Sequence, residues 1–348
     1  MDYSSSWRSP SNIALIKYWG KHGIQLPRNP SFSFTLSACH TDMTVKVLTE
    51  VDESDITVLY AGNEAPHFKP KIESFFNRIQ NTLPWLNNAI IVIDSVNTFP
   101  HGAGIASSAS AFSALALCLM EIDGQIQQQT FLDSDGWRKE VSTIARIGSG
   151  SASRSVFPDC AIWGKSNSVS ESNDEFAIGW GENISNVFKS YQDTILIVSA
   201  GEKSVSSSTG HDLMNTLAYA DSRYQVANKN FDTLIDELKS DTVSDMFINL
   251  CESEALQLHA MMMSGAEPFI LMQPHTLTII REIWKYRKET GIPVCFTLDA
   301  GPNVHMLYPV SSKPDIMSWM QEKLLPYCSD GVFIMDEVGK GPVRLVPA

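Results

Sequence analysis

Short stretches in the first third of the chain alternate hydrophobic and polar residues, the pattern of half-buried β-strands. This pattern predicts strands over residues 32–36, 44–49, 56–60 and 89–95, all rich in β-branched and aromatic residues. An uninterrupted apolar run at 13–16 predicts a further, fully buried strand.

Helical periodicity appears in three places in the first half. Residues 69–81 carry Phe75, Phe76 and Ile79 on one side, and a helix is also expected over 137–147. From Ile105 onward, apolar residues recur at the spacing of one helix face; they are Phe112, Leu115, Ala116 and Leu119.

The second half has a different order of elements. It predicts a strand at 194–199, long helices at 244–263 and 274–290, strands at 294–298 and 304–308, a helix at 314–325 and a strand at 332–336. Gly291 and Pro293 are expected to end the helix before them. This order favours an α+β lobe with an antiparallel sheet. We therefore expect two lobes, residues 1–190 and 191–348, with a cleft between them.

Composition narrows the class of protein. The 348 residues are 43% hydrophobic with a net charge of −13, which argues against a nucleic-acid or anionic-membrane partner. The absence of a run of about 18 apolar residues predicts no membrane-spanning helix. The polar N-terminus lacks a signal-peptide pattern, so we expect a cytoplasmic protein. Six scattered cysteines are expected to be reduced core residues, and eight histidines without metal-binding spacing predict no protein-built metal site.

Four motifs carry candidate chemistry. The first is the apolar strand 13–16 running into Lys17-Tyr18-Trp19-Gly20-Lys21, which places two cations and two aromatic rings at one strand end. Such a group suits a diphosphate or a carboxylate. The alternative is a core strand followed by a lysine that extends to solvent. In an acidic protein, clustered cations are more informative.

The second motif is a glycine-rich loop, 99–105, followed by Ser107, Ser108 and a helix. Glycines let backbone N–H groups approach phosphate, and the helix N-terminus adds partial positive charge. The loop is neither a Walker A motif nor a Rossmann fingerprint. A serine-capped turn without a ligand is the alternative.

The remaining motifs are more ambiguous individually. Residues 146–155 alternate serines with glycine and alanine around Arg154, whose guanidinium can pair with a carboxylate; the alternative is a flexible linker. Asp299 follows an apolar strand and precedes a Gly-Pro turn, where it can deprotonate a hydroxyl or serve the turn alone. A Ser/Thr-rich stretch at 204–209 is a candidate phosphate contact or a solvated loop.

Together, and in this order, the four motifs resemble the diphosphomevalonate decarboxylase family of the GHMP kinase superfamily. The similarity extends from Ser11 to about Asn303 and includes the segment 26–36 after the first motif. The first and third motifs distinguish the decarboxylases from kinase relatives, whereas the glycine-rich loop marks only the superfamily.

The resemblance implies a two-lobed α+β fold, with a ribosomal protein S5 domain 2-like N-terminal lobe and a ferredoxin-like C-terminal lobe. It further implies a homodimer and a cleft for ATP, Mg²⁺ and (R)-5-diphosphomevalonate. The implied reaction phosphorylates the tertiary 3-hydroxyl and then releases phosphate and CO₂ to form isopentenyl diphosphate.

The resemblance also assigns roles to positions of this chain. Asp299 matches the catalytic aspartate at the 3-hydroxyl, and Lys17 matches the lysine beside it. Arg154 matches the arginine that holds the departing carboxylate, and Ser108 the serine nearest the transferred phosphate. Substrate-binding positions match Tyr18, Trp19, Gly20, Lys21, Ser149, Gly150, Ser151, Ala152, Ser153, Arg154 and Ser208. The nucleotide phosphate loop matches Pro100, Gly102, Ala103, Gly104, Ile105, Ala106, Ser107 and Ser108.

Some positions depart from the family pattern. Ser153 stands where cysteine is usual, Pro158-Asp159 where glycines are common, and His211 where methionine is common. Three alternatives remain: a 5-phosphomevalonate decarboxylase, a mevalonate 3-kinase, and a non-catalytic nucleotide-binding regulator. The presence of both Lys17 and Asp299 argues against an enzyme that stops at phosphorylation.

Overall fold

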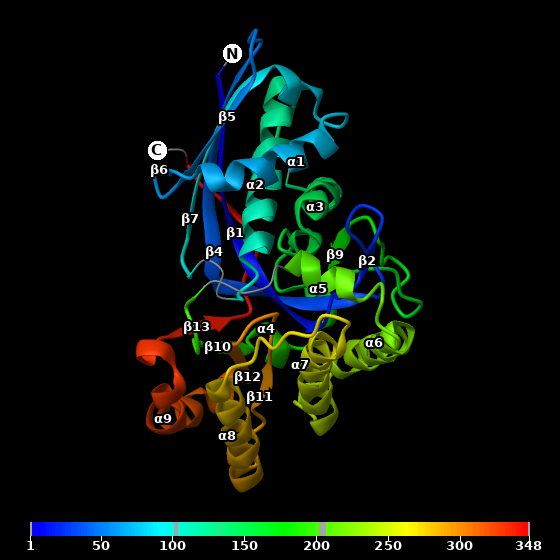
Figure 1. Cartoon of the computed structure of the whole chain (residues 1–348), viewed down its shortest axis with the longest axis vertical. Coiled ribbons are helices and arrows are strands. Elements are labelled where there is room, and N and C mark those ends of the chain that lie inside the picture. The colour runs from blue at the N-terminus through cyan, green and yellow to red at the C-terminus, as the bar shows by residue number, and fades with distance from the viewer. Residues whose placement is uncertain (1, 101–103, 132, 202–206, 347–348) are drawn as a thin grey trace.

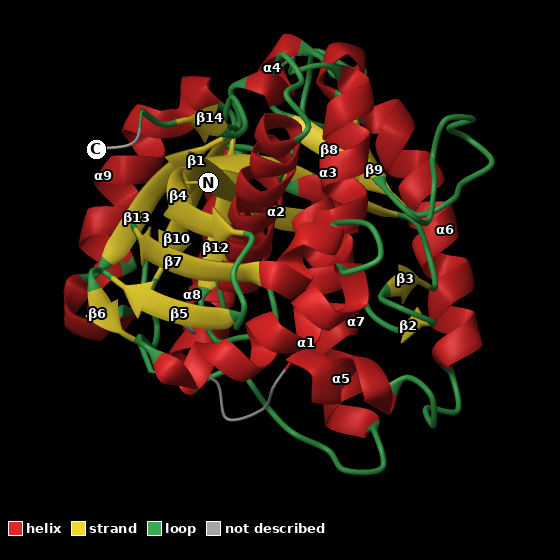
Figure 2. Ribbon diagram, turned by 90° about the horizontal axis from the view of Figure 1, so that it is seen from above, coloured by secondary structure: helices red, strands yellow, loops and turns green. Residues whose placement is uncertain are grey.

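The computed structural model describes residues 2–100, 104–131, 133–201 and 207–346. A larger and a smaller β-sheet follow one another along the long axis of the molecule, and helices pack against both (Figure 1). Seen from above, α1, α2 and α3 lie together on one face of the larger sheet (Figure 2).

The larger sheet has the order β14-β1-β4-β7-β5-β6, and β8 pairs with both β4 and β9. Its pairings are antiparallel except that of β5 with β7. The strands are β1 (Asp2–Ile16), β4 (Ser31–Thr49), β5 (Asp55–Tyr60), β6 (Asn63–Glu64), β7 (Ala89–Asn97), β8 (Cys160–Trp163), β9 (Ala177–Gly179) and β14 (Val343–Arg344). A separate ribbon joins β2 (Lys21–His22) and β3 (Leu26–Pro27).

The first strand is much longer than its apolar run predicts. Its polar N-terminal half is buried because its hydroxyl groups bond to residues on or beside the helix that covers it. Ser5 donates to Glu121 at 2.7 Å, and Ser11 donates to the carbonyl of Ile105 at 2.6 Å. Hydrogen bonds from its polar side chains to neighbouring residues, rather than hydrophobicity, therefore allow this strand to extend to Asp2.

Two predicted strands, 32–36 and 44–49, are one continuous strand, β4, so predicting two was wrong. The exposed residues Ser37 and Ala38 interrupt the hydrophobic pattern midway. The backbone N–H groups of Ser37, Ala38 and Cys39 all donate to the Asp336 carboxylate at 2.7–2.8 Å. The carboxylate of Asp336, distant in the sequence, thus accepts hydrogen bonds from the backbone N–H groups where the hydrophobic pattern breaks.

The three predicted helices of the first half are confirmed as α1 (Lys69–Ile79), α2 (Ser107–Ile126) and α3 (Asp135–Gly148). Their apolar faces form one core with the larger sheet. One helix among the described residues, α2, is long and apolar enough to cross a membrane by length and composition alone. Since 67% of its most apolar window is buried inside the fold, α2 is a core helix here.

The smaller sheet is antiparallel, as predicted, with the order β11-β12-β10-β13. The strands are β10 (Gln192–Leu196), β11 (Cys295–Thr297), β12 (Val304–Tyr308) and β13 (Phe333–Glu337). The helices of this half are α4 (Asn186–Lys189), α5 (Ser207–Leu213), α6 (Ala220–Glu237), α7 (Asp245–Ser264), α8 (Pro274–Thr290) and α9 (Lys313–Lys323). The pattern of hydrophobic residues does not predict α6. As predicted, α8 ends at Gly291, which takes a left-handed conformation with φ of 74°.

A shared hydrophobic core joins the two halves. It contains residues of β1 and β4 together with residues of α6, α7 and the smaller sheet. In addition, β14 near the C-terminus pairs with β1. All six cysteines are buried, which confirms their prediction as core residues, and none forms a disulfide; their reduced state stays a prediction. The domain division at residue 190 stays a prediction.

Candidate active site

A cavity of about 290 Å³ brings together residues from all four sequence motifs. The end of β1, the start of α2, the junction after α3 and the turn after β11 all contribute to its wall. Of the predicted site residues, the cavity is lined by Lys17, Tyr18, Trp19, Lys21, Gly104, Ala106, Ser107, Ser108, Ser149, Gly150, Ser151, Arg154 and Asp299.

Lys17 lies immediately after β1 and is only 3% exposed. Its ammonium donates to Thr297 Oγ1 at 2.8 Å and to the Ala14 carbonyl at 2.5 Å. Burial lowers the pKa of Lys17 to about 8, although the nearby carboxylates of Asp299 and Glu254 oppose that effect. The ammonium is thus a desolvated charge within the field of Asp299.

Arg154, in the short 3-10 helix Gly150–Arg154, is buried with three neutral partners. Its guanidinium donates to Ser33 Oγ at 3.0 Å, Ser31 Oγ at 2.9 Å and Asn12 Oδ1 at 3.2 Å. Burial lowers its pKa to about 10, so it remains charged at neutral pH. Since none of these partners is anionic, the guanidinium keeps its positive charge available to a bound carboxylate.

The start of α2 and the serine-rich segment meet at two hydroxyls. Ser108, in the first turn of α2, lies 3.1 Å from Ser149 between their Oγ atoms. Ala106, just before the helix, has a left-handed backbone with φ of 46°. The N-terminus of α2 therefore opens into the cavity with its N–H groups and hydroxyls, which suits a phosphate group.

The aromatic residues after Lys17 are fixed by His211 from α5. Its Nδ1 accepts the N–H of Gly20 at 3.0 Å, and its ring lies 4.4 Å from Tyr18 and 4.8 Å from Trp19. Burial, reinforced by Lys21, lowers the pKa of His211 to about 3, so the imidazole is neutral. Within the described part of the chain the buried Tyr18 hydroxyl has no hydrogen-bond partner, which leaves it available to a ligand.

Several predicted residues do not line the cavity. Gly20 faces the Tyr224 ring, and Ala152 and Ser153 pack inward, where the Ser153 hydroxyl donates to the Gly150 carbonyl at 2.8 Å. Pro100 and the buried Ile105 also lie off the cavity wall. Gly102, Ala103 and the side chain of Ser208 fall outside the described residues; the backbone of Ser208 lies in α5.

Other cavity residues were not identified from sequence. Asn12 and Lys71 line the cavity, as does His211, which the motif comparison noted only as a departure. Lys71 also lines an adjoining, mainly apolar cavity of about 230 Å³ that shares Ser107 and Ser108. A single lysine on an amphipathic helix gives no local signal, so only the packing of α1 beside α2 identifies it.

The absence of a side chain at Gly150 leaves room for the rings of Tyr18 and Trp163. A Cβ at this position would lie 2.7 Å from Tyr18 Oη and 2.8 Å from the Trp163 ring. We expect Gly150→Ala to lower the free energy of unfolding by about 1–3 kcal/mol, because a buried ring must move. Chemical denaturation measures this. Gly124→Ala is the matched control, since nothing lies within 4 Å of its Cβ. Equal stability of the two variants would contradict the packing described.

Comparison with known proteins identifies the relatives of this arrangement. Residues 9–175 match the diphosphomevalonate decarboxylase-like N-terminal domain, and 194–342 match the mevalonate 5-diphosphate decarboxylase C-terminal domain. A diphosphomevalonate decarboxylase from Debaryomyces hansenii is 28% identical, covering 98% of this chain and 94% of its own. A phosphomevalonate decarboxylase from Haloferax volcanii is 27% identical over 84% of each chain.

Solved structures agree with the sequence relatives. The mevalonate diphosphate decarboxylase from Staphylococcus aureus is 27% identical over 99% of both chains, with a TM-score of 0.83. MDDEF in complex with MVAPP, AMPPCP and magnesium has the same identity and coverage, with a TM-score of 0.81.

The two-lobed α+β architecture and the glycine-rich loop at the start of α2 define a protein of the GHMP kinase fold. Within that class, the chain belongs to the diphosphomevalonate decarboxylase family.

Proposed function

We propose that this protein catalyses the ATP-dependent decarboxylation of (R)-5-diphosphomevalonate to isopentenyl diphosphate, with ADP, phosphate and CO₂ as the other products. The single observation that carries the proposal is that one cavity holds Lys17, Arg154 and Asp299 beside the N-terminus of α2. Family membership and the relatives named above support the same reaction.

In the first step, the 3-hydroxyl oxygen of the substrate attacks the terminal phosphorus of ATP, and ADP leaves. Asp299 accepts the hydroxyl proton as the new O–P bond forms. The Lys17 ammonium, the N-terminus of α2 and the Ser108 hydroxyl stabilise the charge on the transferred group. Phosphoryl transfer depends chiefly on such positioning and charge stabilisation.

In the second step, the C3–O bond breaks and phosphate leaves with the bonding electrons. The bond between the carboxylate carbon and C2 then breaks, CO₂ departs, and its electron pair forms the C2–C3 double bond. Positive charge develops at C3, so the site must orient the carboxylate without adding a further cation at C3. Arg154, held by Ser31, Ser33 and Asn12, can do this from one side.

The nucleotide requires a phosphate site and a base site. The mainly apolar cavity beside Ser107 and Ser108 is lined by Tyr60, Phe68 and Ile72 among others. We assign it to the nucleotide base, because base sites are concave and largely apolar. Lys71 lines both cavities and can reach the phosphates between them.

The residues present fit Mg²⁺ carried by the nucleotide. No group of three or more His, Cys, Asp or Glu able to hold a metal occurs among the described residues. Mg²⁺ commonly uses substrate phosphates and one or two protein oxygens, and Ser107, Ser108 and Asp299 line the phosphate region. When bound, the ion neutralises charge on the phosphates.

Substrate comparison tests the proposal. With ATP and Mg²⁺ we expect diphosphomevalonate to yield ADP, phosphate and CO₂ in equal amounts, because Lys21 and Tyr18 can hold the diphosphate. Released CO₂ and ADP are measured in parallel. Formation of a 3-phosphorylated product without CO₂ would contradict the proposal and indicate a 3-kinase.

A second candidate substrate is 5-phosphomevalonate, which the Haloferax volcanii relative favours. The same assay with both substrates distinguishes them through kcat/KM. A higher value for the monophosphate would assign this enzyme to the phosphomevalonate decarboxylases.

We also propose a cytoplasmic homodimer. Six buried, unpaired cysteines support a reducing compartment, and the resemblance to the family supports the dimer. Light scattering of the purified protein tests the dimer, and fractionation of cells that express the chain tests the compartment.

A further inference from the structure

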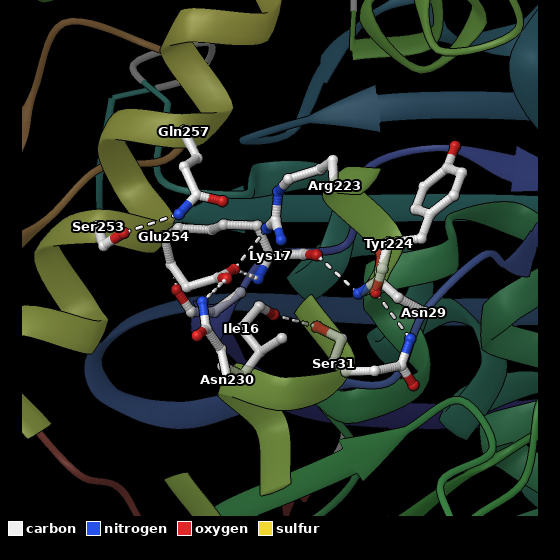
Figure 3. Close-up of polar contacts among 12 residues, drawn as sticks. Ile16, Lys17, Asn29, Ser31, Arg223, Tyr224, Asn230, Ser253, Glu254 and Gln257 are labelled. Carbon is white, nitrogen blue, oxygen red and sulfur yellow. Dashed lines mark hydrogen bonds and ion pairs between the residues drawn. The ribbon is translucent and has the colours of Figure 1, made fainter. Parts of the chain in front are cut away.

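The backbone at Lys17 is held by a carboxylate from the other half of the chain. Glu254, in α7, is 0% exposed, and its Oε2 accepts the N–H of Lys17 at 3.0 Å. Figure 3 shows Glu254 directed from its helix toward Lys17, between Arg223 and Asn230. Glu254 lies outside the four motifs, and neither step of the proposed reaction uses it.

The Glu254 charge is compensated by neighbours on α6. Arg223 donates to Oε2 at 2.5 Å, and Asn230 donates to Oε1 at 2.7 Å. Removing one partner of a buried ion pair is costly, yet such a pair as a whole adds little net stability compared with apolar residues. Stability alone therefore does not account for an acid at this position.

The peptide groups around Lys17 are held from the opposite side as well. Asn29 donates to the Lys17 carbonyl at 3.2 Å, and Ser31 donates to the Ile16 carbonyl at 2.6 Å (Figure 3). Ser31 also accepts from Arg154. The main chain at Lys17 thus cannot shift without breaking bonds to α7, to the segment before β4 and to the arginine site.

We propose that Glu254 is a positioning residue for Lys17: it fixes the Lys17 backbone through the N–H group and keeps the Lys17 ammonium protonated through its negative charge. The inference rests on the proposed function, since it concerns the same reacting centre. It gives α6 and α7 an indirect part in the reaction, because they carry the residues that hold Lys17.

Charged groups on several elements bear on the protonation of Lys17. Burial lowers its pKa to about 8; Asp299, Glu254 and Cys251 act to raise it, and Arg154 acts to lower it. Asp193 of β10 also interacts with the ammonium, and Arg223 of α6 reaches it through Glu254. Without the Glu254 charge, the pKa of Lys17 falls, and the ammonium loses its proton at a lower pH.

The test compares Glu254→Gln with Gln257→Ala. Glutamine keeps an oxygen for the Lys17 N–H but removes the charge, whereas Gln257 lies one turn further along α7 and bonds to Ser253. We expect Glu254→Gln to lower kcat about 10- to 100-fold. The alkaline limb of the pH profile should move about one unit lower. Gln257→Ala should change neither.

A double variant, Arg223→Gln with Glu254→Gln, protects the test against misfolding, because two amides replace the buried ion pair without leaving a lone charge. A direct titration of Lys17 by NMR, with lysine labelled at Cε and the signal assigned through Lys17→Arg, supplies a readout that needs no turnover. We expect the Lys17 pKa to fall in both variants that lack Glu254.

The outcomes separate the two claims. If Lys17 titrates as in the wild type in the folded Glu254→Gln or double variant, the positioning role is overturned. If the wild type does not release CO₂ from diphosphomevalonate, the proposed function fails, and the NMR titration still decides whether Glu254 controls Lys17.

Discussion

Asp299→Asn is expected to reduce turnover by about 10²–10⁴-fold while leaving substrate affinity nearly unchanged. The amide has almost the same shape as the carboxylate but cannot accept the proton of the 3-hydroxyl. The Asp299 backbone carbonyl, which contacts His259 Nε2 at 3.2 Å, is not altered. Single-turnover formation of ADP and calorimetric binding of diphosphomevalonate measure the two effects separately.

A charge-matched control distinguishes chemistry from electrostatics. Asp241→Asn removes one negative charge from an exposed site in the loop after α6, and we expect normal turnover from it. A near-normal rate for Asp299→Asn would rule out the proposed proton transfer.

Arg154→Lys is expected to separate phosphorylation from decarboxylation. Lysine keeps a positive charge but lacks the planar fork that meets Ser31, Ser33 and Asn12 together. Losing directed, charged hydrogen bonds of about 1.5–3 kcal/mol corresponds to a loss of about 10- to 100-fold in CO₂ release. ADP formation should fall less, because Asp299 and the phosphate loop remain.

The ratio of CO₂ to ADP is therefore the decisive measurement for Arg154. A ratio below one, with accumulation of the 3-phosphorylated intermediate, is the expected result. Equal release at the wild-type rate would show that Arg154 does not hold the carboxylate. A thermal melt of Arg154→Lys is needed beside it, since the change leaves buried hydroxyls of β4 without their donor.

The local pattern of hydrophobic residues was sufficient to predict an element whose own residues determine its structure. The helix α8 has apolar periodicity and a glycine stop, and both its ends fall where the pattern placed them. The strand β12 coincides with the predicted 304–308 because every one of its residues is buried. In both cases the information lies within one element.

The local pattern failed to predict an element where hydrogen bonds to distant residues, rather than hydrophobic residues, stabilise it. The polar half of β1 is buried because α2 supplies hydrogen bonds, and β4 continues through its pattern break because Asp336 accepts three N–H groups. The helix α6 was missed in the same way, since its mixed composition gains a clear buried face only against α7 and β1. No window of neighbouring residues contains these partners.

For the candidate site, too, local sequence identified some features and only the tertiary structure revealed others. Lys17, Ser108, Arg154 and Asp299 stand at the ends of strands and helices within distinctive motifs, so the sequence by itself determined which residues to test and the family they indicate. The tertiary structure decided that their four segments share one cavity, that Lys71 and His211 join them, and that Glu254 accepts the backbone N–H of Lys17. These relations join residues far apart in the chain, such as Lys17 and Thr297, whose side chains bond across 280 positions and meet only after the two halves have packed around their shared core.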